Sequence, residues 1–186
     1  MNIQFIDRQM EMNMLKDFLK GSGGIFVLWG RRRVGKSRLL TELSKGMYSA
    51  YLLATRETEK EILRSYSEQL GTSMGDPALG SAFFDSFRNM LRYIQNKREG
   101  KPFLLVLDEF PHLCEANHSI PSILQAEWDQ NNLSSMHIIL SGSTVSSMES
   151  EVLAVKSPLY GRRVGQHKLQ PLGPLEAKGF FPSMTW

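Results

Sequence analysis

Residues 25–43 read IFVLWGRRRVGKSRLLTEL, and this stretch decides the fold. It opens with an apolar run typical of a buried strand and closes with apolar residues at helical spacing. Between them, residues 30–37 (GRRRVGKS) match G-x-x-x-x-G-K-[ST], the Walker A phosphate loop. Because a strand precedes the pattern and a helix follows it, the sequence predicts a nucleotide-binding α/β domain.

Each part of this loop has a predicted chemical role. Gly30 and Gly35 allow a tight turn in which successive backbone N–H groups point inward. The helix that follows directs the positive end of its dipole at the same spot. Lys36 is expected to reach the terminal phosphates as a catalytic residue, and the Ser37 hydroxyl is expected to bind Mg²⁺. The predicted nucleotide-contacting residues of this segment are Gly30, Arg31, Arg32, Arg33, Val34, Gly35, Lys36, Ser37 and Arg38.

Hydrophobic periodicity places further elements on both sides of the loop. A helix is expected from about residue 7 to 20, ended by the glycine-rich residues 21–24. The other expected elements are helices over residues 57–70, 81–97, 120–133 and 144–155, strands over residues 48–55, 103–107, 137–140 and 166–169, and a loop over residues 71–80. Strands that alternate with helices predict a three-layer α/β/α sandwich with a mainly parallel sheet.

The strand expected over residues 103–107 is apolar at every position and ends in Asp108-Glu109. Such strands are usually buried on both faces, and ligands bind at the carboxyl ends of strands in open α/β sheets. Asp108 is expected to hold Mg²⁺ through water, because magnesium prefers carboxylate and water oxygens, and Glu109 is expected to orient and polarise an attacking water. The alternative is an exposed acidic turn, but the preceding Walker A loop favours a Walker B pair.

The next buried strand ends in Leu140-Ser141-Gly142-Ser143-Thr144. A polar side chain at this point of the sheet is able to contact the γ-phosphate or the catalytic water. Ser141 and Ser143 are both candidates for this sensor role, and Ser143 is favoured. The alternative is a simple helix cap, for which serine and threonine are common.

Six segments together resemble one family: FIDRQME (residues 5–11), GRRRVGKSRLL (30–40), FLLVLDEF (103–110), IILSGSTVSSM (138–148), SPLYGRR (157–163) and LQPLGP (169–174). They resemble the archaeal-type ATPases, which belong to the signal-transduction ATPases with numerous domains, a branch close to the AAA+ class of P-loop NTPases. The resemblance covers nearly the whole chain. It implies ATP as ligand, hydrolysis as activity, and a sheet in which the sensor strand lies between the two Walker strands.

The resemblance also implies roles for two arginines outside the Walker motifs. Arg8 is implied to lie near the base and ribose, although Gln9 follows it where the family usually has glutamate. Arg162, in preference to Arg163, is implied to sense or contact phosphate as a catalytic residue, because an arginine stabilises charge on a transferring phosphoryl group. The alternative for Arg162 is a surface charge that precedes a strand.

Members of the family continue into a helical lid, a winged helix and often a further domain. We therefore expect residues 1–173 to form the ATPase core and residues 174–186 to begin a truncated lid, with the lid and C-terminal domains absent. Without a lid, ADP and ATP are expected to bind at micromolar affinity or weaker, and turnover is expected to be slow. The apolar residues expected to favour self-association are Leu172, Leu175, Phe180 and Phe181.

The composition is that of an ordinary globular protein. The chain has 186 residues and a net charge of +3, which does not by itself indicate a nucleic-acid surface. Cys114 is the single cysteine, so a cytoplasmic location is expected, and its segment with His112 and His118 is expected to be a plain loop rather than a zinc site. No apolar run approaches the ~20 residues of a membrane span, so no membrane partner is expected.

The leading interpretation is a Mg²⁺-dependent, ATP-hydrolysing switch that acts on downstream domains. One alternative is an AAA+-type nucleic-acid-associated ATPase that contacts DNA only through domains beyond this chain, and another is a nucleotide-binding scaffold with little turnover. A small-molecule kinase is disfavoured, because an adjacent Asp-Glu pair suits water activation. GTP specificity would need an Asn-Lys-x-Asp run, and residues 96–99 (NKRE) end in glutamate and precede the Walker B strand.

Overall fold

Parallel strands form a central five-stranded sheet in the order β2-β3-β4-β1-β5. The computed structural model describes residues 8–80 and 82–173. The strands are β1 (Gly24–Trp29), β2 (Ser49–Leu53), β3 (Phe103–Asp108), β4 (Met136–Gly142) and β5 (Arg163–Lys168). Every neighbouring pair is parallel, which confirms the predicted sheet, and β4 separates β1 from β3 as the resemblance implies.

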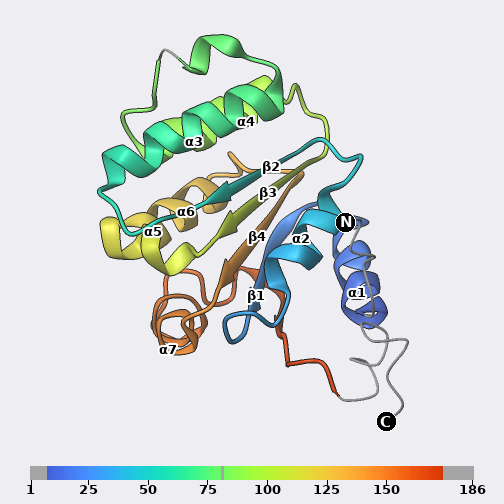
Figure 1. Cartoon of the computed structure of the whole chain (residues 1–186). Coiled ribbons are helices and arrows are strands. Elements are labelled where there is room, and N and C mark those ends of the chain that lie inside the picture. Colours follow the sequence, from blue (N-terminus) through green and yellow to red (C-terminus); the bar gives the residue numbers. More distant parts are fainter. Residues whose placement is uncertain (1–7, 81, 174–186) are drawn as a thin grey trace.

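Helices cover both faces of this sheet, as Figure 1 shows. On one face, α1 (Gln9–Leu19) and α2 (Lys36–Ser44) pack against one hydrophobic cluster. On the other face, α3 (Glu59–Met74), α4 (Phe87–Lys97), α5 (Phe110–Ala116) and α6 (Ile120–Asp129) pack against a second cluster. The predicted three-layer sandwich is therefore confirmed. Within the described ranges, no helix is both long enough and apolar enough to cross a membrane.

The parallel arrangement brings the carboxyl ends of β1, β3 and β4 to one edge of the sheet. Trp29 at the end of β1 pairs with Gly142 of β4, and Leu107 of β3 pairs with Leu140. The phosphate loop, the acidic pair and the segment that starts at Ser143 therefore begin side by side. All residues of β1, β3 and β4 are buried, so the loops that leave them start from a rigid base.

Two of the predicted helices differ most from the structure in their bounds. The helix expected over residues 81–97 begins only at Phe87, because the Ser86 hydroxyl oxygen accepts the N–H of Asn89 and caps it at 3.2 Å. The helix expected over residues 144–155 is divided into α7 (Val145–Met148) and a π-helical turn, η2 (Glu149–Leu153). Both predictions were right about the presence of helix and wrong about its extent.

Two segments predicted to be loops contain helix. In the loop expected over residues 71–80, α3 continues to Met74 and a 3-10 turn, η1 (Pro77–Gly80), follows. The plain loop expected around Cys114 is helix α5, which has Pro111 in its first turn, where a missing N–H costs little. Cys114 itself is buried and lies in the core.

The predicted start of a lid, residues 174–186, lies outside the described residues. The same holds for Leu175, Phe180 and Phe181. Leu172 is described and is half-buried. Self-association through this apolar group therefore stays a prediction.

Candidate nucleotide-binding site

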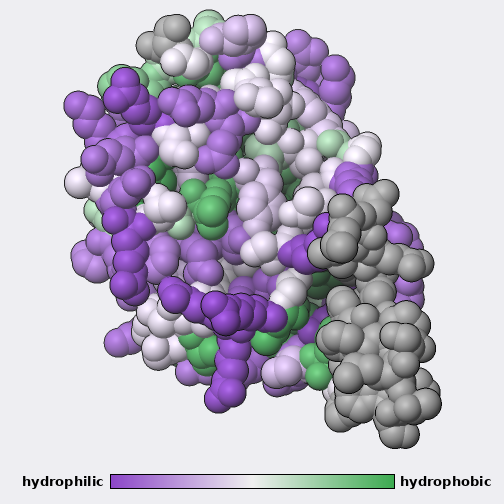
Figure 2. Space-filling model, viewed as in Figure 1, coloured by the Kyte–Doolittle hydropathy of each residue, from purple (hydrophilic) through white to green (hydrophobic). Residues whose placement is uncertain are grey.

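A cavity of about 510 Å³ opens at the carboxyl edge of the sheet, within the size range of small-molecule sites. The phosphate loop and the start of α2 form one wall, and the ends of β2, β3 and β4 form the other. Figure 2 shows strongly hydrophilic side chains over this loop. The lining residues are Arg32, Arg33, Gly35, Lys36, Ser37, Arg38, Ala54, Thr55, Arg56, Glu109, His112 and Ser143.

Two glycines give the phosphate loop its shape. Gly35 has a φ of 97°, in the left-handed region that glycine adopts freely, and directly precedes α2. A Cβ added at Gly30 would lie 2.3 Å from the carbonyl oxygen of Leu169. This close approach arises because the N–H of Leu169 donates to the carbonyl of Trp29 at 2.7 Å. The loop thus needs glycine at both ends: a positive φ requires it at Gly35, and the close approach of Leu169 requires it at Gly30.

Lys36, the first residue of α2, is buried beneath the loop. Its Nζ donates to the carbonyl oxygens of Gly30 at 2.9 Å and Arg31 at 3.1 Å. Burial lowers the pKa of the Lys36 ammonium, and the carboxylates of Glu109 and Asp108 oppose that shift. The ammonium therefore lies at the centre of the loop with acceptors that a phosphate oxygen is able to replace.

Ser37 and Asp108 meet across the cavity wall. The Ser37 Oγ donates to Oδ2 of Asp108 at 2.9 Å, and Oδ1 accepts the backbone N–H of Glu109 at 3.0 Å. The hydroxyl of Tyr51 on β2 donates to the same Oδ2. Hydroxyl and carboxylate oxygens are ligands that Mg²⁺ prefers, so the Ser37 and Asp108 oxygens fit a magnesium site.

Glu109 lies between the Ser37–Asp108 pair and Ser143. It has a left-handed φ of 52° and immediately precedes α5. Its Oε2 accepts the backbone N–H of Ser143 at 3.2 Å and the Ser143 Oγ at 3.0 Å. Ser141, in contrast, is fully buried in β4, and its Oγ has no hydrogen-bond partner among the described residues. Of the two sensor candidates, the structure therefore brings Ser143 to Glu109.

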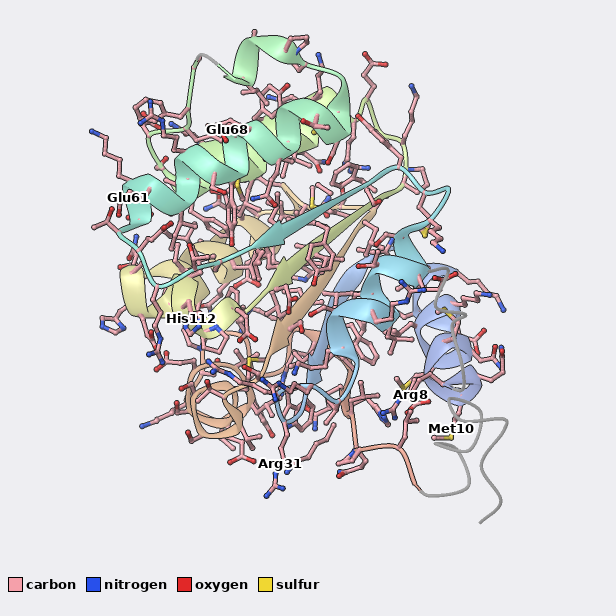
Figure 3. The ribbon with its side chains drawn as sticks, in the orientation of Figure 1. Arg8, Met10, Arg31, Glu61, Glu68 and His112 are labelled. Carbon is pink, nitrogen blue, oxygen red and sulfur yellow. The ribbon has the colours of Figure 1, made fainter. Side chains whose placement is uncertain are left out.

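Arg8 contacts the phosphate loop from the side of α1, where Figure 3 labels it. It is buried, and its Nη1 donates to the carboxylate of Glu11 at 2.8 Å. Its Nη2 donates to the carbonyl oxygens of Val34 at 2.9 Å and Gln170 at 2.7 Å. Arg8 thus ties the loop to the segment after β5, and its contact with a base or ribose stays a prediction.

The structure does not bring Arg162 to the cavity. Because β5 runs parallel to β1, and Arg163 pairs with Ile25 near the start of β1, Arg162 lies at the opposite edge of the sheet. Its Nε and Nη2 each donate to the carboxylate of Asp129 at 2.7 Å. This position agrees with the alternative interpretation of Arg162, which is a surface charge that precedes a strand. The guanidinium of Arg163 lies over the Tyr160 ring instead.

Arg31 also lies away from the main cavity. It is exposed, as Figure 3 shows, and lines a second cavity of about 500 Å³ with the end of β5. The other loop arginines, Arg32 and Arg33, face the main cavity with Arg38. The positive charge predicted from the loop is therefore divided between two sides of it.

Comparison with known proteins identifies the family. Residues 5–184 match the family described as an ATPase domain predominantly from Archaea. The chain belongs to this ATPase family. Over 185 residues, it is 31% identical to the uncharacterized protein MJECL04 of Methanocaldococcus jannaschii. The alignment covers 98% of this chain and 39% of that protein.

The fold of this ATPase domain is similar to two solved archaeal structures. One is the Walker-type ATPase PABY2304 of Pyrococcus abyssi, with a TM-score of 0.74 and 22% identity over 96% of this chain and 57% of that one. The other is the Aeropyrum pernix ORC2 protein in ADPNP–ADP complexes, with a TM-score of 0.70 and 16% identity over 98% of this chain and 53% of that one. The ATPase domain thus spans roughly half the length of these relatives, or less.

Four polar or charged residues near the site were not predicted from the sequence of this ATPase domain. Thr55 and Arg56 line the cavity because β2 lies beside β3, a neighbour relation that no local pattern indicates. His112 lines it because α5 begins directly after Glu109, and the segment was expected to be a loop. Tyr51 reaches Asp108 from the middle of β2, and strand register would have been needed to find it.

Proposed function

We propose that this chain is the ATP-binding and ATP-hydrolysing core of a nucleotide-driven switch that requires Mg²⁺. The observation that carries the proposal is that one cavity edge brings together the Lys36 ammonium, the Ser37–Asp108 pair and the Glu109 carboxylate. Each group serves a different part of the reaction. Family membership supports ATP as the nucleotide and hydrolysis as the reaction class.

The binding part of the reaction uses the phosphate loop. Lys36 exchanges the carbonyls of Gly30 and Arg31 for phosphate oxygens, and the N-terminal end of α2 faces the same anion. The Ser37 Oγ and the Asp108 carboxylate would hold Mg²⁺, which when bound neutralises charge that develops on the phosphates. Arg32, also in the cavity wall, adds positive charge.

The hydrolytic part uses Glu109. Its carboxylate accepts a hydrogen bond from the attacking water, orients it toward the γ-phosphate and takes up its proton. Ser143 fixes this carboxylate through two hydrogen bonds to one oxygen, Oε2, which leaves Oε1 for the water. Hydrolysis removes the γ-phosphate, which is the group beside Glu109 and Ser143. The ATP and ADP forms therefore differ at these two residues, and this difference is the basis of the switch.

The proposal is tested by measuring how Mg²⁺ affects nucleotide binding. We expect ADPNP to bind the wild-type chain more tightly in Mg²⁺ than in EDTA by calorimetry, and ATP to be converted to ADP and phosphate. In Asp108→Ala, Mg²⁺ should no longer increase the affinity for ADPNP. The affinity for ADPNP in EDTA should stay within about twofold of wild type, because the loop that contacts the phosphates is unchanged. The matched control is Asp129→Ala, which removes an aspartate at the opposite edge of the sheet.

Failure of the folded wild-type chain to bind ADPNP would contradict the proposal as a whole. If the chain bound ADPNP but released no phosphate in a single-turnover assay, it would be a scaffold and not an enzyme. Retention of the full Mg²⁺ gain in Asp108→Ala would contradict the metal-binding role of Asp108.

Ser143→Ala is expected to slow hydrolysis by about tenfold, because the Glu109 carboxylate loses a hydrogen bond that positions it. ADPNP affinity should change little. Ser141→Ala is the matched control, because the buried Ser141 hydroxyl has no partner to lose among the described residues and its removal leaves no polar group unpaired. Single-turnover phosphate release from both variants checks this prediction. Equal slowing in both would remove the distinction that the structure makes between the serines.

A further inference from the structure

We propose that Tyr51 is a positioning residue for the magnesium ligand Asp108. The inference rests on the proposed function, because it assigns a task within the same metal site. Tyr51 belongs to neither Walker motif and does not line the cavity. Its hydroxyl donates to Oδ2 of Asp108, the same oxygen that accepts the Ser37 Oγ.

The sheet register explains why a residue in the middle of β2 reaches the end of β3. Leu53 of β2 pairs with Asp108, and Tyr51 pairs with Val106. Residues two positions apart in a strand face the same side, so Tyr51 and Asp108 project toward α2, about 7 Å apart along the strand direction. A phenol is long enough to cover that separation, whereas serine or threonine at position 51 would fall short.

Packing fixes the position of the Tyr51 hydroxyl. The ring is half-buried and packs against the cluster formed by α1, α2 and one face of the sheet. A tyrosine side chain has only two rotatable angles, so a packed ring holds its hydroxyl in one place at little further entropic cost. The donor is therefore provided by the core of the fold and not by a mobile surface group.

Three donors together define the orientation of the Asp108 carboxylate. Oδ1 accepts the N–H of Glu109, and Oδ2 accepts the hydroxyls of Ser37 and Tyr51. A tyrosine hydroxyl keeps its proton at neutral pH, so Tyr51 is able to donate to the Asp108 carboxylate. If the Ser37 oxygen were to hold Mg²⁺, the hydroxyl of Tyr51 would remain as a side-chain donor to Oδ2 of Asp108.

Groups that orient a metal ligand through hydrogen bonds typically contribute 10- to 100-fold in metal affinity. For Tyr51→Phe, which keeps the ring and removes only the hydroxyl, we expect the Mg²⁺ concentration that gives half of the gain in ADPNP affinity to rise about tenfold. The affinity for ADPNP in EDTA should remain within about twofold of wild type, and the melting temperature should change little. Mn²⁺ binding followed by electron paramagnetic resonance in the presence of ADPNP reads the metal directly and should weaken in parallel.

Tyr93→Phe is the matched control for this experiment. The hydroxyl of Tyr93 donates to Oδ2 of Asp76 at 2.6 Å, so the control removes the same kind of tyrosine–aspartate hydrogen bond. Neither residue of this pair lines the nucleotide cavity. The control variant should show the Mg²⁺ and Mn²⁺ dependence of the wild-type chain.

The outcomes distinguish this inference from the proposed function. If Mg²⁺ did not increase the ADPNP affinity of the wild-type chain, the proposed metal site and the role of Tyr51 would both be overturned. If Mg²⁺ increased the wild-type affinity and Tyr51→Phe had the same Mg²⁺ dependence, only the role of Tyr51 would be overturned. An equal loss of ADPNP affinity in EDTA and in Mg²⁺ for Tyr51→Phe would also overturn the role of Tyr51, because a general structural effect does not depend on the metal.

Discussion

Lys36→Ala is expected to abolish measurable ATP binding by the folded chain, with affinity lowered about a hundredfold or more. Hydrogen bonds to charged groups contribute ~1.5–3 kcal/mol each, and the Lys36 ammonium lies where it can donate to two phosphates. Alanine removes both contacts and also the positive charge beneath the loop. Calorimetry with ADPNP measures the loss, and the melting temperature shows whether the variant is folded.

Lys45→Ala is the control for this variant. Lys45 lies at the other end of α2 and pairs with Glu42 near the surface, so its removal changes the net charge by the same amount. We expect wild-type affinity in this control. A folded Lys36→Ala chain that bound ADPNP as tightly as wild type would contradict the assignment of the phosphate loop.

Glu109→Gln is expected to stop turnover while nucleotide stays bound. The amide keeps an oxygen that accepts the hydrogen bonds from Ser143, but it cannot take up the proton of the attacking water. General-base catalysis contributes ~10²–10⁴ in rate, so phosphate release should slow at least about a hundredfold. Affinity for ADPNP in Mg²⁺ should remain within about threefold of wild type, because Lys36, Ser37 and Asp108 are unchanged.

Single-turnover phosphate release is the appropriate measurement, because it separates the chemical step from product release. Glu99→Gln serves as the control, since Glu99 is exposed in the turn before β3 and lies outside the cavity. Hydrolysis by Glu109→Gln at the wild-type rate would show that another group activates the water.

The sequence predicted the elements that carry the Walker motifs because each is marked by a long apolar run or by fixed motif residues. It misplaced the start of α4, where the Ser86 cap overrides an apolar pattern that extends further back. It missed α5 because seven residues are too few to display helical periodicity. Local patterns thus identified the strong elements and failed where a cap or a short helix decided the structure.

The site was predicted as far as its residues are adjacent in sequence. Lys36, Ser37, Asp108 and Glu109 belong to two contiguous motifs, and the structure brings them together. The contribution of Tyr51 depends on strand order and register, which the local sequence does not encode. The same missing information explains Arg162, since only the direction and neighbour of β5 reveal that it begins at the far edge of the sheet.

The hydrogen bonds from Arg8 to the carbonyl oxygens of Val34 and Gln170 have a consequence for the order of folding during synthesis. In the described part of the chain, β1 pairs only with β4 and β5, which are both made long after it. Arg8 and Gln170 are separated by 162 positions, so their contact closes late and at a high loop entropy. A ribosome-bound chain that already displays the complete Walker A motif therefore lacks the strands and the arginine contact that hold it. We therefore expect the nucleotide site of the nascent domain to form only after the segment that follows β5 has emerged.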